Sequence, residues 1–193
     1  MVDRLKDESL RQLFLDARTH RAWQPREVPD ALLKEIVDLM KMGPTASNGL
    51  PGRVVFVKSK AAKERLKPHL NAGNVDKTMA APATAIVAYD LKFFAHPPKG
   101  QDALNGFAEK PEQALTAALR NGSLQGGYLI LAARSLGLDC GPMSGFDNGG
   151  VDREFFAGTD FKSNFLCNLG YGDPAALKAR GSRFSFDEMA KIL

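Results

Sequence analysis

The sequence is poor in the residues that build metal sites and disulfides. It has two cysteines, Cys140 and Cys167, and three histidines among 193 residues. His20, His69 and His96 are not spaced to complete a tetrahedral zinc site with two isolated cysteines. We therefore expect no metal centre, and we expect the two thiols to be reduced, as is usual in the cytoplasm.

Long apolar runs and targeting signals are lacking as well. No apolar stretch approaches the roughly 20 residues that a membrane-spanning helix requires. No basic, then apolar, then small-residue pattern opens the chain as a secretory signal would. The expectation is a cytoplasmic protein without a membrane partner.

Charge of one sign is not concentrated anywhere. The net charge is +4, but 26 lysines and arginines are scattered among 22 acidic residues. A nucleic-acid partner, which usually requires a basic patch or run, therefore gains little support. A basic nucleic-acid-binding domain stays open as a rival hypothesis, and so does a site for a small anion.

Common enzyme signatures are also missing. The sequence contains no GxGxxG, GxxxxGK[ST], GxSxG or HExxH motif. A dinucleotide-binding fingerprint or a phosphate-binding loop of the usual kind is thereby excluded. If the chain binds a phosphate, side chains from distant segments must come together to do so.

Apolar periodicity predicts several helices in what we expect to be one domain, residues 1–193. A first helix runs from Leu5 to about Arg18, and a second begins after Val28-Pro29-Asp30 and stops at Gly43-Pro44. Three further helices are expected: one capped by Ser59 that reaches about Leu70, a long one from Pro111 to about Leu136, and a short one with a capping box at Ser185–Glu188. Gly126-Gly127 in the long helix suggests the close approach of a neighbour.

Strands are predicted where short runs are rich in β-branched and aromatic residues. These runs are 53–57, 84–89 and, as a third candidate, 164–171. Residues 71–74 indicate a loop by composition, and residues 91–110 indicate a mobile loop or cap. Strands interspersed with helices indicate an α/β or α+β domain of undetermined topology.

Two basic segments, one near each end, are suited to bind a phosphate. Arg18-Thr19-His20-Arg21 offers two guanidinium groups and a hydroxyl just past a helix, and Arg180 and Arg183 lie in a similar stretch near the C-terminus. Taken alone, each segment fits a solvated basic turn better than a phosphate site. Phosphate binding is therefore a hypothesis that requires the two segments to meet.

Two segments rich in glycine and small polar residues could lie against a planar ligand. Residues 43–49 (Gly-Pro-Thr-Ala-Ser-Asn-Gly) concentrate hydroxyl, amide and backbone donors directly after a helix. Residues 141–147 (Gly-Pro-Met-Ser-Gly-Phe-Asp) let a backbone approach a ring closely. Plain turns are the alternative interpretation of both.

Taken together, these segments resemble the nitroreductase family. The resemblance spans nearly the whole chain, from Arg-Thr-His-Arg-Ala-Trp (18–23) through the two small-residue loops to Ser-Arg-Phe (182–184). Within the family, residues 16–20, 77–78, 141–147 and 170–173 are most similar to the malonic semialdehyde reductase branch.

The resemblance implies an α+β fold with a mixed central sheet flanked by helices, in an intertwined homodimer with FMN at the interface. It implies that Arg18 and Arg183 hold the FMN phosphate, with Thr19 and His20 beside them and help from Arg180. The other FMN contacts implied by the resemblance are Arg21, then Pro44, Thr45, Ala46 and Asn48 from the partner subunit, then Asn74 and Lys77, and finally Pro142, Met143, Ser144 and Gly145.

The implied activity is reduction of a small electrophile by NADH or NADPH through the flavin N5, without a catalytic triad. Arg21 or Lys77 could stabilise the reduced flavin. Malonic semialdehyde is the implied acceptor, with His96, Lys99 or Arg53 as candidate cations for its carboxylate. A broad nitro- or quinone reductase and a flavin-binding protein without turnover are the alternatives.

This chain departs from the family pattern at two places. Leu50-Pro51-Gly52 follows the first small-residue loop where the widespread family form has Gln-Pro-Trp, and Gly181 replaces a second basic residue of some relatives. The phosphate contact therefore depends more on Arg183. Residues 93–110 are where we expect substrate identity to be determined, and one sequence does not decode it.

Overall fold

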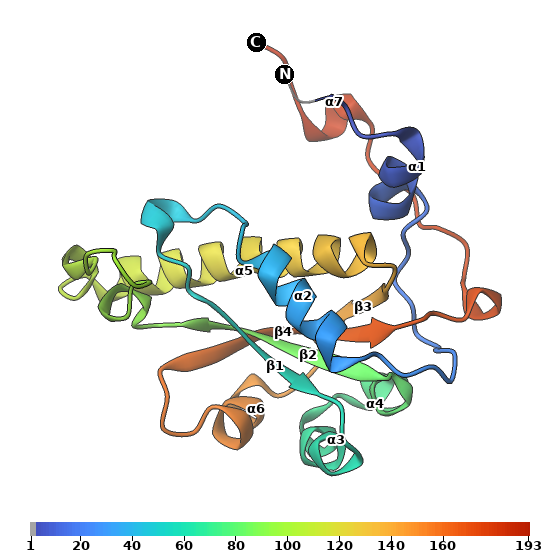
Figure 1. Cartoon of the computed structure of the whole chain (residues 1–193), viewed down its shortest axis with the longest axis horizontal. Coiled ribbons are helices and arrows are strands. Elements are labelled where there is room, and N and C mark those ends of the chain that lie inside the picture. The colour runs from blue at the N-terminus through green and yellow to red at the C-terminus, as the bar shows by residue number, and fades with distance from the viewer. Residues whose placement is uncertain (1–2) are drawn as a thin grey trace.

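The structure is a computed structural model that describes residues 3–193. Its centre is a four-stranded sheet in the order β1-β2-β4-β3 (Figure 1). The strands are β1 (Gly52–Val57), β2 (Ala83–Asp90), β3 (Asp139–Met143) and β4 (Phe161–Gly170). All three strand pairs are antiparallel. The expected α+β class is confirmed, but the expected mixed sheet is not, because the one parallel contact within residues 3–193 is an isolated bridge between Thr19 and Cys140.

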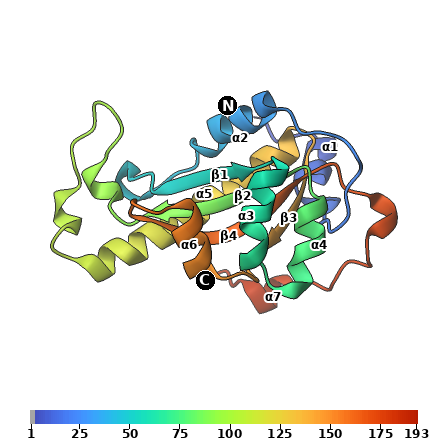
Figure 2. The ribbon, with the colours of Figure 1, turned by 90° about the horizontal axis from the view of Figure 1, so that it is seen from below.

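Helices cover both faces of the sheet. On one face lie α2 (Asp30–Met40) and the long α5 (Pro111–Ser135), and on the other lie α3 (Lys60–Leu66), α4 (Ala72–Ala80) and α6 (Asn148–Phe155) (Figures 1 and 2). Near the two ends of the chain, α1 (Asp7–Leu10), extended by a π-helical turn over Arg11–Leu15, and α7 (Phe186–Met189) lie beyond the body of the domain (Figure 1).

Strand β2 is buried because helices pack on both of its faces. Ala83, Ala85 and Val87 face α2 and α5, whereas Ile86 and Ala88 face α3 and α6, as the two-residue period of a strand requires. The close approach predicted for α5 is confirmed at Gly126, where an added Cβ would lie 2.6 Å from a ring atom of Phe165. It is not confirmed at Gly127, which has no neighbour within 4 Å.

Most predicted elements are present, and three were missed. Residues 71–74, expected to be a loop, mostly belong to α4, and the small-residue loop at 141–147 begins inside β3. Helix α6 was not predicted at all. Pro142 can occupy a strand because β3 is an edge strand, where a missing N–H need not break a ladder.

The loop expected to be mobile, residues 91–110, contains two 3-10 turns at Phe93–Ala95 and Asn105–Phe107. An aromatic cluster joins these turns, with ring centroids of Phe93 and Phe107 5.2 Å apart. Phe93 is buried and anchors the loop. Trp23 and Phe56 are both half-buried.

The C-terminal end of α4 is capped by a buried lysine from α3. Nζ of Lys63 donates hydrogen bonds to the carbonyl oxygens of Thr78 (2.8 Å) and Ala81. The carbonyl oxygen of Met79 lies 3.4 Å from the same Nζ. Helices leave their last carbonyl groups without partners, and a cation is favoured at this end of the helix dipole. Burial nevertheless lowers the pKa of Lys63 to about 8, since the charged form loses hydration.

No helix in residues 3–193 is both long enough and apolar enough to cross a membrane.

Lys63 makes stability depend on pH in a specific direction. The folded chain releases the Lys63 proton near pH 8, whereas the unfolded chain keeps it up to the ordinary pKa of 10.5. Between these values the unfolded state binds more protons, so the free energy of unfolding contributed by this group rises with pH. We expect the wild type to gain stability over a Lys63→Met variant between about pH 7.5 and about pH 9.5. Urea melts of both proteins measure this difference, and an unchanged difference would contradict the expectation.

Candidate functional site

The segment after α1 is held between β3 and the segment that follows β4. The backbone N–H of His20 donates to the carbonyl of Cys140 on β3 at 3.0 Å. Three residues later, Trp23 forms an antiparallel bridge with Gly172. The side chain of Asp139 also joins the two sides, since it accepts from Gly172 N–H at 2.9 Å and lies 3.3 Å from Nε2 of His20.

Two arginines tie the first and last segments together directly. Arg180 donates to the carbonyl oxygens of Leu15 (2.6 Å) and Ala17 (3.0 Å), which lie at the end of the first helix. Arg18 donates to the carbonyl oxygen of Lys178. Arg180 thus caps a helix end, as an ordinary structural arginine does.

These contacts enclose a basic pocket of about 260 Å³. Its lining carries five cationic side chains and one carboxylate, that of Asp173. The cationic residues are Arg18, Arg21, Lys178, Arg180 and Arg183, and Thr19 and His20 complete the wall from the N-terminal side. The two basic segments therefore do meet. Guanidinium groups that converge without matching carboxylates are suited to bind a phosphate.

Two side chains of the pocket, those of His20 and Arg183, also contact other groups of the protein. The imidazole of His20 is buried, its Nε2 faces Asp139, and its Nδ1 has no hydrogen-bond partner in the described chain. Arg183 is exposed, and its guanidinium donates to the carbonyl oxygens of Gly181 and Ser182 at 2.9 Å. Its remaining N–H groups stay free for a ligand.

A second cluster forms where the chain leaves β3, between segment 142–145 and α4. The carbonyl oxygen of Gly145 accepts from Nδ2 of Asn74 (2.6 Å) and from the N–H of Asn71 (3.1 Å). Thr78, one residue after Lys77, is 3.5 Å from the sulfur of Met143. The predicted residues of α4 and of segment 142–145 are thus neighbours.

Lys77 links the cluster to the pocket. Burial and, secondly, the positive charge of Arg21 lower the pKa of Lys77. In residues 3–193 neither Lys77 nor Arg21 forms a salt bridge with a carboxylate. Two neighbouring cations without a counter-ion repel each other, so the arrangement favours binding of an anion or an electron-rich ring edge.

The loop at 43–49 lies on the far side of the molecule from the N-terminal and C-terminal segments that line the basic pocket (Figure 1). The N–H of Ala46 donates to Asn121 in the middle of α5, and the amide of Asn48 donates to Gln101. The non-glycine residues with positive φ in the described chain all lie here, namely Ser47 (52°), Asn48 (51°) and Leu50 (42°). Such backbone strain is concentrated at functional sites. A single chain therefore does not bring Pro44, Thr45, Ala46 and Asn48 to the other predicted contacts.

The candidate substrate cations lie near this loop. Arg53 and His96 line two small pockets, of about 310 and about 270 Å³. The guanidinium of Arg53 is already engaged by Asp90 at 2.8 Å and by the carbonyls of Leu50 and Gly52. His96 and Lys99 are exposed.

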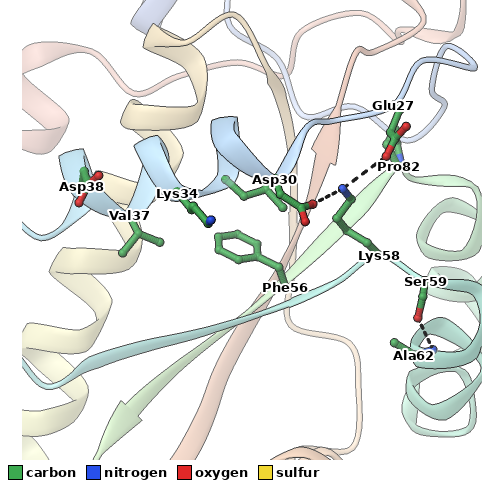
Figure 3. A pocket seen from close by; sticks show the side chains of 11 residues that line it. Glu27, Asp30, Lys34, Val37, Asp38, Phe56, Lys58, Ser59, Ala62 and Pro82 are labelled. Atoms are coloured by element: carbon green, nitrogen blue, oxygen red, sulfur yellow. Dashed lines mark hydrogen bonds and ion pairs between the residues drawn. The ribbon is translucent and has the colours of Figure 1, made fainter.

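A larger groove of about 1000 Å³ lies between α2, β1 and the start of α3 (Figure 3). Its floor is apolar, with Val37 and Phe56, and it is lined by two lysines and three carboxylates. Of the lysines, Lys58 is paired with Asp30 at 2.5 Å and with Glu27 at 3.6 Å. The hydrogen bond to Asp30 raises the pKa of Lys58. Because the positive charge of Lys58 is already matched by carboxylates, this groove is a poorer phosphate site than the smaller basic pocket.

The two cysteines are buried and lie against each other on β3 and β4. The hydrogen bond with Cys140, and then burial, raise the pKa of Cys167 well above its ordinary range. A thiol that stays protonated is a poor nucleophile and a poor metal ligand. Among residues 3–193 no group of three or more His, Cys, Asp or Glu side chains could hold a metal ion.

Comparison with known proteins identifies the family. Residues 15–171 match the model of the nitroreductase family. A protein from Burkholderia lata, provisionally named an NADH dehydrogenase/NAD(P)H nitroreductase, is 59% identical over 191 residues, with 97% of this chain and 98% of the relative covered. A protein of the same provisional name from Stenotrophomonas maltophilia is 57% identical, with 100% of both chains covered.

Solved structures agree on the fold. A nitroreductase-type protein from Exiguobacterium sibiricum, crystallised in complex with FMN, superposes with a TM-score of 0.85 at 18% identity, with 100% of both chains covered. A nitroreductase-type protein from Bacillus subtilis superposes with a TM-score of 0.86 at 21% identity, with 97% of this chain and 100% of the other covered. Together with the family match, these similarities show that the chain belongs to the nitroreductase family.

Proposed function

We propose that this chain is an FMN-dependent oxidoreductase that uses NADH or NADPH to reduce a small electrophilic substrate. The observation that carries the proposal is the convergence of Arg18, Arg21 and Arg183 on one pocket beside β3. Family membership and the FMN bound by the Exiguobacterium sibiricum protein support it.

The residues present fit FMN in both charge and shape. The basic pocket offers guanidinium groups to a phosphate, and Thr19 adds a hydroxyl. The neighbouring cluster offers Asn74 and Lys77 to the ring or the ribityl chain. Pro142, Met143, Ser144 and Gly145 are not buried, and their small or flexible side chains leave room for a planar ring. When bound, FMN supplies hydride transfer at its N5 atom.

The protein's part is binding, orientation and electrostatics. Arg18 and Arg183 hold the phosphate, while Arg180 fixes the segment that carries Arg183 by capping the first helix. Lys77, beside Arg21, places positive charge where negative charge develops on a reduced ring. No acid, base or nucleophile of the chain is needed for hydride transfer.

A second copy of the chain completes the site in this proposal. The exposed surface of α5 carries Leu115, Leu119, Leu124 and Tyr128, each at least 38% exposed. Exposed apolar groups of this extent are typical of a protein interface. The C-terminal segment adds Phe184, Phe186, Met189, Ile192 and Leu193, all at least 59% exposed. A homodimer would bury these groups and bring the strained loop 44–48 to the partner's flavin.

Malonic semialdehyde is the acceptor that we propose first, on the branch-level resemblance of residues 16–20, 141–147 and 170–173. Reduction of its aldehyde gives 3-hydroxypropanoate, and a cation must receive its carboxylate. Lys99 and His96, which are exposed, suit this role better than Arg53, whose guanidinium is paired with Asp90. A broad nitro- or quinone reductase is the second candidate, favoured by the names of the relatives.

The first experiment tests for the flavin and its turnover. We expect the purified protein to be yellow, or to become so with added FMN, and to bleach when NADH or NADPH is added without oxygen. Stopped-flow reoxidation by malonic semialdehyde, nitrofurazone and a quinone then ranks the acceptors. Yellow protein that does not bleach would indicate a flavin-binding protein without turnover. Colourless protein with salt-sensitive affinity for DNA would favour the nucleic-acid hypothesis.

A charge reversal tests the phosphate position. Arg183→Glu places a carboxylate beside the phosphate dianion, and we expect the Kd for FMN to rise about 10- to 100-fold, because a charged hydrogen bond contributes about 1.5–3 kcal/mol. The control is Lys60→Glu, the same change of charge at an exposed residue of α3. Fluorescence titration of the apoproteins measures both constants, and unchanged affinity in Arg183→Glu would show that the phosphate lies elsewhere.

A third experiment tests the dimer. Leu119→Glu puts a charge into the apolar surface of α5, and we expect a shift from dimer to monomer together with loss of FMN. Ala61→Glu adds the same carboxylate to an exposed position of α3 and should change neither. Analytical ultracentrifugation and the absorbance of bound flavin give the two readouts. A wild type that sediments as a monomer with FMN bound would contradict the shared site.

A further inference from the structure

The backbone carbonyl of Lys77 is held at two points by side chains from distant parts of the sequence. Nε1 of Trp23 donates to it at 3.0 Å, and Nδ2 of Asn168 on β4 donates at 3.2 Å. This carbonyl lies in the last turn of α4, where no helical N–H is available to it. Two donors on one such oxygen fix the position of Lys77 against both the sheet and the N-terminal segment.

The orientation of the Asn168 amide follows from its buried surroundings. Its Oδ1 accepts from the hydroxyl of Thr84 at 2.7 Å, so its Nδ2 must point toward α4. The same Nδ2 lies 3.4 Å from the hydroxyl of Thr78. Asn168 and both threonines are fully buried. A buried amide with all its partners present is rigid, because no water can replace them.

The orientation of Trp23 is fixed by the sheet. Its indole ring lies over two glycines, one on β3 and one on β4. A Cβ added at Gly141 would be 3.3 Å from Cζ2 of the indole, and a Cβ added at Gly170 would be 3.0 Å from Cε3. Because these two glycines have no side chains, the indole ring can lie close to the strands with its N–H directed at α4.

Lys77 itself is half-buried, and the charge of Arg21 acts on it. A flexible lysine placed beside another cation would normally move its ammonium group toward solvent. The fixed backbone limits that movement, since the side chain starts from a set position and direction. Held this way, Lys77 lies near Arg21, whose charge acts on it, and one residue before Thr78, whose hydroxyl contacts Met143 of segment 142–145.

We infer that Trp23 and Asn168 are positioning residues, which hold Lys77 by its backbone carbonyl and thereby keep its ammonium group at the ring of the bound flavin. This inference rests on the proposed function. A cation kept near the ring stabilises the reduced, negatively charged flavin more than the oxidised one. The two residues therefore set the midpoint potential of the flavin without contacting it.

The test is a double-mutant cycle with Trp23→Phe and Lys77→Met. Phenylalanine keeps an aromatic ring at this position, but it removes the N–H donor together with part of the indole, so a control for loosened packing is needed. We expect Trp23→Phe to make the potential more negative, equivalent to about fivefold weaker binding of reduced relative to oxidised FMN, the size of one ordinary hydrogen bond. In the Lys77→Met background the same change should have no further effect. Equal shifts in both backgrounds would overturn the inference.

Gln24→Leu is the matched control. The amide of Gln24, the next residue, donates to the carbonyl oxygen of Gly172 at 2.9 Å, so the variant loses a comparable hydrogen bond from the same segment without affecting α4. It should lower the melting temperature and leave the flavin potential unchanged. A shift in Gln24→Leu as large as that in Trp23→Phe would show that general loosening of the segment is the cause, which also overturns the inference.

A second measurement needs no variant. The chain has one tryptophan, so a single indole N–H signal reports on the bond to Lys77. We expect this proton to exchange with solvent slowly in the FMN-bound protein, and exchange at the rate of free tryptophan would overturn the inference. Wild-type protein that binds no FMN refutes the proposed function itself. Wild-type protein that binds FMN, with a potential indifferent to Trp23→Phe, refutes only the positioning role.

Discussion

Carbonyl oxygens at helix ends must find donors, and this constraint shapes the whole candidate site. In this chain the donors come from side chains of remote segments. Arg180 caps the first helix and so joins the two ends of the sequence, while Lys63 caps α4 and so joins it to α3. Each capping contact is an ordinary structural interaction. The contacts of Arg180 help to enclose the pocket that Arg18, Arg21 and Arg183 also line, whereas Lys63 fixes the end of the helix that carries Lys77.

The elements that could be predicted from sequence are those specified by local pattern. The amphipathic period of α2 and the β-branched runs of β1 and β2 depend on neighbours along the chain, and the structure confirms all three. Helix α4 was missed because Asn71, Gly73 and Asn74 favour a turn by composition, whereas its C-terminal end is stabilised by donors from α3, β4 and the N-terminal segment. Strand β3 was missed because Pro142 argues against a strand unless the strand is known to lie at an edge.

The same distinction applies to the site. The meeting of the basic segments was expected from family resemblance, since no spacing within either segment distinguishes it from a solvated turn. The contacts that bring them together join residues about 160 positions apart in sequence, as between Arg18 and Lys178. Lys63, Asn168 and Asp139 were not singled out, because their importance lies in the carbonyls and N–H groups that they meet after folding. The one signal available was Trp23, a lone indole next to a basic segment.

The N-terminal segment has a second consequence through its bridge to β3. An uncovered edge strand presents free N–H and C=O groups on which another chain can add, and this is a common route to aggregation. Here the pairing of Thr19 and His20 with Cys140 covers that edge, and Pro142 removes one donor from it. The same pairing therefore positions the arginines of the N-terminal segment at the pocket and covers the edge of the sheet. Selection against aggregation through this sheet edge would also preserve the geometry of the pocket.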